Sequence, residues 1–466
     1  MDEPGSPGRG ETLARAARVH LVGAGGAGMS ALAKLLFQQG RTVTGSDLKQ
    51  SPALADLSDL GIEVWTGSRP ESAILADLVV ASSAVPATDP ELVAATANGV
   101  TVWQRPDLLG ALTAVMPAIG VTGTHGKTSS TALVVTALRA LGRDPSFVVG
   151  GDLVDQRTNA HLGETGLFVL EADEAFGTFL HLDLVGLVVT NVDAEHLEHY
   201  GDIAALDDAF ASVVAGVRGP AIVGIDDPGG RRLAAATGAE TYGTAPDAHW
   251  RIENVEEGPA AVRFRLLGPD TQVDVEVGRP GAHMARNAAG ALALVGLFGM
   301  DVAAAAMSFR AFAGVRRRFE VRGEVGGVTL IDDYAHHPTE VAATLSAARR
   351  GPWRRVWAVF QPHLFSRTLA LHDQFGAAFA LADRVVVTDV FPAREAPIPG
   401  VTGELVAAAA RRSIPATVDY LPHRADLARF IASKVEPGDV VLTMGAGDIT
   451  SLPDELVPLL VERWGR

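Results

Sequence analysis

The chain has 466 residues, of which 47% are hydrophobic, and its formal net charge is −16. This length predicts three domains, and the acidic balance argues against a nucleic-acid-binding protein, which needs a basic face. The sequence contains no cysteine, which excludes disulfides, thiolate catalysis and zinc–thiolate sites. Because we find neither an apolar signal core nor an apolar run of bilayer-spanning length, we expect a cytoplasmic protein without membrane insertion.

Residues 1–17 are expected to form a flexible arm that leads into a first strand over residues 18–22. A glycine-rich loop and a helix follow this strand. The spacing is that of a G-x-G-x-x-G motif, and Asp47 ends the next strand. Alone, this pattern indicates NAD with Asp47 on a ribose, but a sugar nucleotide would also satisfy it, because the motif specifies only a phosphate at a helix N-terminus. A tight turn without ligand is the third interpretation.

A second glycine-rich stretch follows the apolar run that begins at Ala118. Its glycines are Gly120, Gly123 and Gly126, and Lys127, Thr128 and a helical pattern come next. This is the strand–loop–helix order of a P-loop, although Val121 replaces the first glycine of the strict motif. Lys127 would neutralise the β- and γ-phosphates of a nucleotide, and Thr128 would offer its hydroxyl to Mg²⁺.

Acidic clusters end two later strands, at residues 171–174 and 191–196. In open α/β sheets ligands lie at the carboxyl ends of the strands, so these clusters are candidates for a Mg²⁺ shell beside the P-loop. From residue 250 to residue 278 the pattern alternates, which predicts a small antiparallel flap. His283 and Asn287 are four residues apart and could share one helix face.

The last part of the chain alternates strands and helices again, which predicts a third α/β domain. Three arginines at residues 316–318 precede it, and guanidinium groups bind phosphate or carboxylate oxygens bidentately. Polar residues follow its strands at 332–338, 361–368 and 445–448. No Gly-x-Ser-x-Gly elbow and no His-Glu-x-x-His motif occurs, so serine hydrolysis and zincin chemistry are not supported.

Together these motifs resemble the Mur ligases. The resemblance rests on Gly-Thr-His-Gly-Lys-Thr at 123–128, Glu-Ala-Asp-Glu at 171–174, Thr-Asn-Val-Asp-Ala-Glu-His at 190–196, Arg-Arg-Phe at 317–319, Asp-Asp-Tyr-Ala-His-His-Pro-Thr-Glu at 332–340 and Pro-His-Leu-Phe-Ser-Arg-Thr at 362–368. It covers the chain after the arm and implies three domains. Residues 18–116 would bind a UDP-sugar, residues 117–313 would form the ATP-binding P-loop domain with its flap, and residues 314–466 would contact the amino acid and ATP. The N- and C-terminal domains are expected to be Rossmann-like.

Within this family, the resemblance implies an ADP-forming ligase that joins L-alanine to the lactyl carboxylate of UDP-N-acetylmuramate through an acyl phosphate, for peptidoglycan precursor synthesis. It implies Mg²⁺ with ATP, but no NAD, zinc or haem, and a monomer or weak homodimer. The implied catalytic residues are Lys127, His196, Arg318, His337 and Arg367. Those implied for ATP are Gly120, Gly123, Thr124, His125, Gly126, Lys127, Thr128, Ser129, His283, Asn287 and Arg318. Those implied for the UDP-sugar are Gly23, Gly25, Gly26, Ala27, Gly28, Met29, Ser30, Ser46, Asp47, Ser82, Ser83 and His363, and those for the metal are Thr128, Glu171, Glu174 and His196.

Three other functions stay open at this point. One is a recycling ligase that joins a whole peptide to the same UDP-sugar, and another is an NAD dehydrogenase, which would leave the P-loop unexplained. The third is a nucleotide-binding regulatory homologue without turnover, because the chain departs from the family pattern: Ala175-Phe176 replace Ser-Asp, Met284 replaces the Asn that usually follows His283, and Ser129-Ser130 replace part of the threonine run of the P-loop. No mechanistically required residue is lost by these departures.

Overall fold

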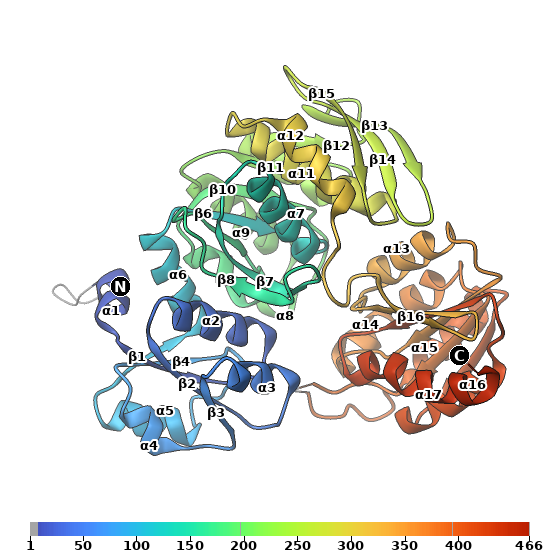
Figure 1. Ribbon diagram of the computed structural model, residues 1–466, viewed down its shortest axis with the longest axis horizontal. Helices are drawn as coiled ribbons and strands as arrows, with labels where there is room; N and C mark the ends of the chain where they lie inside the picture. The colour runs from blue at the N-terminus through green and yellow to red at the C-terminus, as the bar shows by residue number, and fades with distance from the viewer. Residues whose placement is uncertain (1–7, 196, 394, 466) are drawn as a thin grey trace. The chain divides into compact units, whose positions relative to one another are not determined.

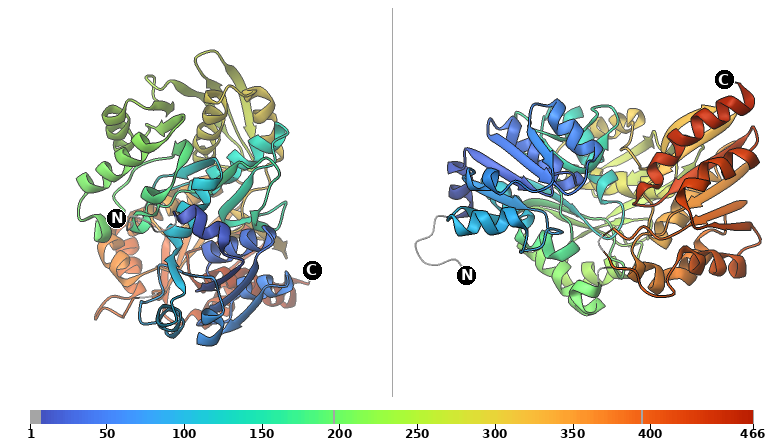
Figure 2. Two further views of the ribbon diagram at one scale, coloured as in Figure 1. Left: turned by 90° about the vertical axis from the view of Figure 1, so that its left-hand side faces the viewer. Right: turned by 90° about the horizontal axis from the view of Figure 1, so that it is seen from below.

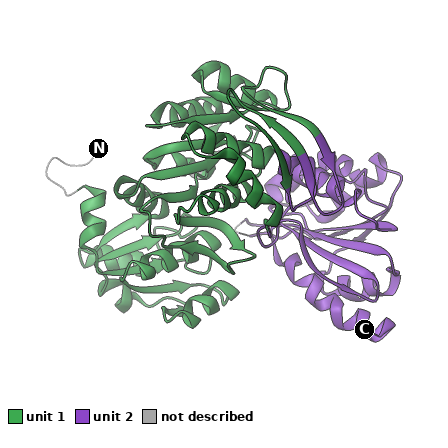
Figure 3. Cartoon of the chain, turned by 45° about the horizontal axis from the view of Figure 1, so that its top comes forward, with its two compact units in different colours: residues 1–254, 264–276, 286–312 green, residues 255–263, 277–285, 313–466 purple. Residues whose placement is uncertain are grey.

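The computed structural model describes residues 8–195, 197–393 and 395–465, and within them it contains three β-sheets covered by helices (Figures 1 and 2). The chain divides into two compact units. The first comprises residues 1–254, 264–276 and 286–312, and the second comprises residues 255–263, 277–285 and 313–466 (Figure 3). The predicted α/β class is confirmed, whereas the predicted domain boundaries stay predictions.

The N-terminal sheet of the first unit is parallel throughout and has the order β3-β2-β1-β4-β5. Its strands are β1 (Arg18–Val22), β2 (Thr42–Asp47), β3 (Glu63–Thr66), β4 (Leu78–Ala81) and β5 (Thr101–Gln104). Leu21 and Val80 pack in one cluster with α2 (Ala27–Gln38) and α6 (Arg105–Val115), whereas Val22 and Val79 pack on the other face with α4 (Pro70–Ile74) and α5 (Pro90–Ala97). Helix α3 (Pro52–Asp59) connects β2 to β3. Burial of both faces explains why the central strands β1 and β4 are apolar over most of their length, whereas β3 and β5 at the edges keep exposed polar residues.

Residues 9–15, which we expected to belong to a flexible arm, form helix α1 (Arg9–Arg15). Leu13 is 2% exposed and Ala16 is 2% exposed, and the helix packs against α6. Burial of these apolar side chains stabilises a short helix that is too polar to be recognised from its sequence.

The central sheet has the order β15-β14-β13-β12-β11-β10-β6-β9-β7-β8. Its strands are β6 (Ala118–Thr122), β7 (Ser146–Leu153), β8 (Thr158–His161), β9 (Phe168–Glu171), β10 (Leu184–Val189), β11 (Ala221–Gly224), β12 (Glu240–Gly243), β13 (Trp250–Glu257), β14 (Val262–Leu267) and β15 (Gln272–Val277). β6 runs parallel to both its neighbours, β10 and β9, so the residues that follow these three strands lie at one edge. Short turns join β13, β14 and β15, as expected for a flap.

Helices connect the strands of the central sheet in sequence, and further helices follow its last strand. They are α7 (Lys127–Ala140), α8 (Leu197–Tyr200), α9 (Ile203–Gly216), α10 (Pro228–Thr237), α11 (Ala282–Leu297) and α12 (Val302–Ser308), with 3-10 turns η1 (Ala175–His181) and η2 (Phe309–Ala311). α7 packs against β6, β7 and β9, so the P-loop helix is anchored on the sheet that carries the site.

The sheet of the second unit has the order β16-β17-β21-β18-β19-β20 and is parallel except for β16. Its strands are β16 (Glu320–Val325), β17 (Val328–Asp333), β18 (Arg355–Phe360), β19 (Arg384–Thr388), β20 (Thr417–Leu421) and β21 (Asp439–Met444). One face packs on α13 (Pro338–Ala348), α14 (Phe365–Ala378) and α15 (Gly403–Ser413), and the other packs on α16 (Leu427–Lys434) and α17 (Leu452–Trp464). The 3-10 turns η3 (Arg424–Asp426) and η4 (Asp448–Ser451) precede the last two helices.

Among the described residues, no helix is both long enough and apolar enough to cross a lipid bilayer.

Candidate active site

The segment predicted to be a P-loop follows β6 and depends on two glycines with left-handed backbone. Gly123 has φ +120° and Gly126, the N-cap of α7, has φ +82°. A Cβ atom at Gly123 would lie 2.2 Å from Thr190 Oγ1, and one at Gly126 would lie 2.7 Å from Asn287 Oδ1. Side chains are therefore excluded from both positions by conformation and by space. The loop ends at the N-terminus of a 14-residue helix, where backbone N–H groups favour an anion.

Lys127 lies at this helix terminus and forms a buried ion pair. Its Nζ is 2.8 Å from each carboxylate oxygen of Glu174, whose side chain is 1% exposed, and donates to the Gly123 carbonyl at 2.8 Å. Burial disfavours the ammonium, but the charges of Glu174 and Asp173 outweigh it and raise the pKa of Lys127. The lysine is therefore charged at neutral pH and is held by groups that an incoming polyphosphate could replace.

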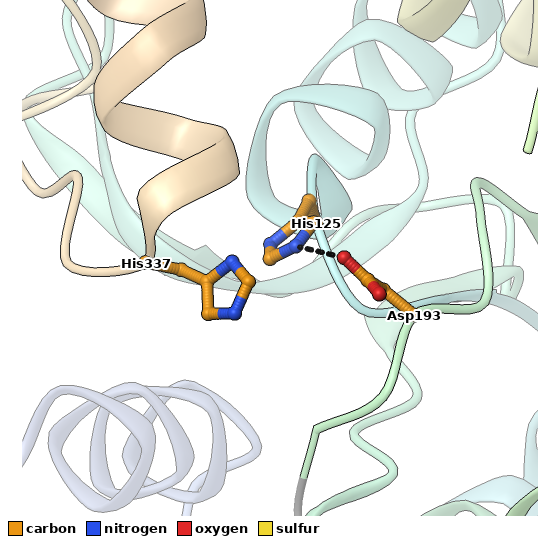
Figure 4. Close-up of side chains that lie close together, drawn as sticks. All are labelled: His125, Asp193 and His337. Carbon is orange, nitrogen blue, oxygen red and sulfur yellow. Dashed lines mark ion pairs between the residues drawn. The ribbon is translucent and has the colours of Figure 1, made fainter. Parts of the chain in front are cut away.

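Residues after β10 fasten the P-loop from the side. Thr190 Oγ1 donates to the His125 carbonyl at 2.6 Å, and the Asn191 side chain donates to the same carbonyl at 2.9 Å while accepting the His125 N–H at 2.9 Å. Asp193 N–H donates to Thr124 Oγ1 at 2.8 Å. His125 Nε2 and Asp193 Oδ2 face one another at 3.6 Å (Figure 4). The loop is thus fixed before any ligand binds.

The predicted metal ligands differ in their surroundings and in the groups that they already bind. Thr128 is buried in the first turn of α7. Glu171 ends β9 and accepts the Gly150 N–H at 2.5 Å through Oε1. Glu174, by contrast, is engaged by Lys127. His196 lies outside the described residues.

Helix α11 carries the two residues predicted for the adenine ring. Asn287 is 7% exposed and lies against Gly126. His283 lies one turn earlier in the same helix, and its ring packs against Gly281. A Cβ atom added at Gly281 would lie 2.5 Å from His283 Cε1. Among the other predicted ATP contacts, Gly120 is buried within β6 and Ser129 is half-buried in α7.

The first glycine-rich loop is fixed on the end of β2. Gly23 and Ala24 donate their N–H groups to the Ser46 carbonyl at 2.9 and 2.8 Å, and Gly25 donates to Asp47 Oδ2 at 2.9 Å. Asp47 therefore caps the loop in this structure. The Ser46 hydroxyl points into the domain and donates to Glu91, so its predicted contact with the UDP-sugar would have to be made by the backbone.

The remaining residues predicted for the UDP-sugar differ in accessibility. Gly26 and Ala27 are exposed at the start of α2, and Ser82 and Ser83 follow β4 with half-buried and exposed side chains. Met29 and Ser30 are buried, and the Ser30 hydroxyl donates to the Ala27 carbonyl at 3.0 Å. A side chain at Gly28 would meet the Arg105 guanidinium at 3.1 Å. Arg105 is a cation beside this loop that was not predicted from the sequence.

In the second unit, buried carboxylates hold the loop that carries Arg317 and Arg318. Asp333 accepts the N–H groups of Phe319 and Ala335 at 2.8 and 2.7 Å, and Arg317, with φ +60°, lies 3.5 Å from Asp332 through its Nε. Burial raises the pKa of Asp333 to about 6, although the charge of Arg318 opposes it. The guanidinium of Arg318 lies over the Tyr334 ring at 4.9 Å.

Further predicted residues gather after β17 and β18. His337 is 4% exposed and is the N-cap of α13, where its N–H donates to Glu340 Oε2 at 3.2 Å. His363 stacks on Phe391 with ring centroids 5.8 Å apart, and Arg367 is half-buried in the first turn of α14.

Asp332 and Asp333 support these loops and were not predicted as site residues. Asn191 and Asp193 belong to the cluster at residues 191–196 that was predicted as part of a Mg²⁺ shell, and here they contact the loop at residues 123–126. Their position after a strand, next to a motif that was identified, was the available signal. Asn191 and Asp333 bind backbone groups of loops, whereas Asp193 faces the His125 ring and Asp332 accepts hydrogen bonds from the Thr443 and Thr450 hydroxyls. Contacts of either kind cannot be read from residue spacing.

Three family models match the chain. They are the catalytic domain of the Mur ligase family over residues 18–115, the Mur ligase middle domain over residues 121–295 and the glutamate ligase domain of Mur ligase over residues 317–447.

Curated relatives and solved structures agree with these models. The UDP-N-acetylmuramate–L-alanine ligase of Thermobifida fusca is 42% identical over 463 residues, which are 96% of this chain and 97% of the relative. The UDP-N-acetylmuramate–L-alanine ligase of Kineococcus radiotolerans is 44% identical, and the match covers 97% of this chain and 98% of the relative. The crystal structure of the UDP-N-acetylmuramate-alanine ligase MurC from Thermotoga maritima superposes with a TM-score of 0.82 at 28% identity, covering 96% of this chain and 99% of that one. The crystal structure of a murein peptide ligase from Psychrobacter arcticus gives a TM-score of 0.70 at 25% identity, and the match covers 95% of this chain and 98% of that one.

Proposed function

Because the chain belongs to the Mur ligase family, we propose that it joins L-alanine to the lactyl carboxylate of UDP-N-acetylmuramate, with ATP converted to ADP and phosphate. The observation that carries this proposal is the pre-formed P-loop with its charged Lys127, in a chain whose relatives of 42–44% identity over nearly the full length bear that activity as their name.

The chemistry needs two steps, because a carboxylate is a poor electrophile at neutral pH. In the first, a lactyl carboxylate oxygen attacks the γ-phosphorus of ATP, which forms an acyl phosphate and releases ADP. In the second, the neutral amine of L-alanine attacks the acyl carbon, the C–O bond to phosphate breaks, and the amine loses a proton. Phosphoryl transfer depends mainly on positioning and charge stabilisation.

Lys127 is the residue that we assign to charge stabilisation in the first step. Its ammonium would leave Glu174 for the phosphate oxygens, while Gly123, Gly126 and the N-terminus of α7 surround the polyphosphate with N–H groups. In the second unit, Arg318, His337 and Arg367 are the groups that we propose to contact anionic substrate oxygens or the acyl phosphate. His283 and Asn287 would contact adenine.

The residues beside the P-loop fit Mg²⁺. The hydroxyl of Thr128 and the carboxylate of Glu171 are oxygen donors, and Glu171 uses only one oxygen for the Gly150 N–H. We propose these two as its protein ligands, with His196 and Glu174 as further candidates. When bound, Mg²⁺ supplies positive charge to the phosphate oxygens.

We infer that residues 18–116 bind the UDP-sugar through the loop at Gly23–Ser30, with Asp47, Ser82 and Ser83 beside it. His363 stays a predicted contact of the same ligand. Residues 117–313 and 314–466 would be the other two domains. A cytoplasmic peptidoglycan-precursor enzyme that acts as a monomer or weak homodimer is consistent with these assignments.

A second candidate, the ligase that attaches a whole peptide to the same UDP-sugar, is favoured by the likeness to the Psychrobacter arcticus enzyme. The lower TM-score and identity of that match make it the weaker proposal.

Oxygen-18 in the lactyl carboxylate of UDP-N-acetylmuramate tests the proposed route. With L-alanine and MgATP, one labelled oxygen should appear in the released phosphate and the other should remain in the amide product, both detected by mass spectrometry. Phosphate without label, formed together with amide, would contradict the acyl phosphate. Lys127→Ala should yield neither product.

A further inference from the structure

A buried polar network lies at the end of β2, directly behind the glycine-rich loop at residues 23–26. Ser46, Glu91 and His20 form it, with exposures of 2%, 1% and 0%. Ser46 Oγ donates to Glu91 Oε2 at 2.5 Å, and the Arg69 N–H donates to Glu91 Oε1 at 2.6 Å. His20 Nε2 is 3.6 Å from Glu91 Oε2. None of these side chains reaches the loop surface.

The network is connected to the loop through one peptide group. The Ser46 carbonyl accepts the N–H groups of both Gly23 and Ala24, at 2.9 and 2.8 Å. Rotation of the Ser46 peptide would therefore displace the first two residues of the loop. The Ser46 side chain, held by Glu91, opposes that rotation.

Glu91 is a charged anchor. Burial alone would raise its pKa, but the contacts with His20 and Ser46 and the Arg69 N–H together lower it. Both carboxylate oxygens of Glu91 therefore accept hydrogen bonds in a buried site. Loss of the Ser46 hydroxyl or of the Arg69 N–H as a donor would leave part of the buried charge without a hydrogen bond. A carboxylate at this position costs desolvation that an apolar side chain would avoid, which points to a role in geometry.

We propose that Glu91 is a positioning residue for the UDP-sugar: by holding Ser46, it fixes the glycine-rich loop that receives the diphosphate. This inference rests on the proposed function. Glu91 touches no substrate and acts only through Ser46, with His20 and the Arg69 N–H orienting its carboxylate.

The test compares Glu91→Gln and the milder Ser46→Ala with a control, Asp77→Asn. Asp77 is exposed, and its carboxylate accepts two backbone N–H groups, those of Ala17 and Arg18 at 2.9 and 2.8 Å, at the opposite end of β1. Amide hydrogen exchange of the peptide that contains residues 23–30 is measured in the full-length protein, together with kcat and the KM values for UDP-N-acetylmuramate and ATP.

Exchange in residues 23–30 should be about tenfold faster in Glu91→Gln than in the wild type or Asp77→Asn, because a buried hydrogen bond is lost, and Ser46→Ala should accelerate it to a smaller extent. The KM for UDP-N-acetylmuramate should rise about tenfold in the test variants, while kcat and the KM for ATP change less than about twofold. Exchange and KM values that match those of Asp77→Asn would overturn the proposal, as would an equal loss in all kinetic parameters. If the wild type shows no UDP-sugar-dependent turnover, the proposed function fails, and the exchange data alone decide whether Glu91 positions the loop.

Discussion

At the scale of single residues, the buried pair of Lys127 and Glu174 links stability to chemistry. Removing only the lysine leaves a carboxylate that is 1% exposed without its cation, so Lys127→Met should lower the free energy of unfolding by about 3 kcal/mol. The double variant Lys127→Met/Glu174→Gln should recover most of that loss, because the buried charge is gone, yet it should release no phosphate from ATP. Urea unfolding and phosphate release measure the two effects. Equal stability of the single and double variants would refute the buried-charge explanation.

Asp333 gives the second residue-scale prediction, a pH dependence of stability. Its pKa is raised to about 6 by burial, from an ordinary value of 3.8. A folded-state pKa above the unfolded one means that protonation favours the folded state, so this contribution is complete below about pH 4 and is lost as the pH rises through about 6. Relative to Asp333→Asn, the wild type should gain up to about 3 kcal/mol between about pH 7 and pH 4. Urea titrations at several pH values measure the difference, and a pH-independent difference would contradict the raised pKa.

At the scale of elements, the P-loop depends on glycine for space as well as for conformation. Gly142, just beyond the other end of α7, has φ +72°, and no atom lies within 4 Å of the position that a Cβ atom would take there, so Gly142→Ala should cost only about 1 kcal/mol and preserve ATP binding. In Gly123→Ala the added Cβ atom would also clash with Thr190 Oγ1 and the Asn191 backbone. This variant should therefore lose several times more unfolding free energy than Gly142→Ala and should not bind ATP. Calorimetric titration with ATP and urea unfolding compare the two. Similar behaviour of both variants would show that backbone strain alone matters.

Strands that are buried on both faces could be predicted because such burial produces apolar runs, and β1 lies over residues 18–22, where the sequence pattern predicts it. By contrast, β8, β12 and β16 have polar or glycine-containing sequences. The pairing that makes them strands is a tertiary contact that their own residues do not reveal.

The candidate site was predictable to the level of strand ends. Lys127 and the acidic cluster at residues 171–174 meet because β6 and β9 are parallel neighbours. Which carboxylate pairs with the lysine was not predictable, because Glu174 lies beyond the end of its strand in a loop. Likewise, the inward turn of the Ser46 hydroxyl depends on Glu91, which is 45 residues away in the sequence.

At the scale of the whole molecule, we propose that two loops bind phosphate groups, at residues 23–30 and 120–131, and that they bind their ligands independently. Saturation with MgATP or with UDP, at about a hundred times Kd, should each stabilise the protein by about 2.7 kcal/mol. Lys127→Ala should abolish the thermal shift caused by MgATP and leave the shift caused by UDP unchanged. Ser46→Ala should reduce the shift caused by UDP and leave the shift caused by MgATP unchanged. Loss of both shifts in either variant would mean that the loops are not independent.

The identity of its substrates defines the reaction that we propose for this protein. The most direct measurement is phosphate release from ATP by the full-length protein with Mg²⁺ and UDP-N-acetylmuramate, with L-alanine, other amino acids or the peptide added one at a time. We predict release that requires both UDP-N-acetylmuramate and L-alanine and is lost in Lys127→Ala. Release only with the peptide would move the assignment to the recycling reaction, and absence of release under every condition, with nucleotide still bound, would contradict the proposed ligase activity.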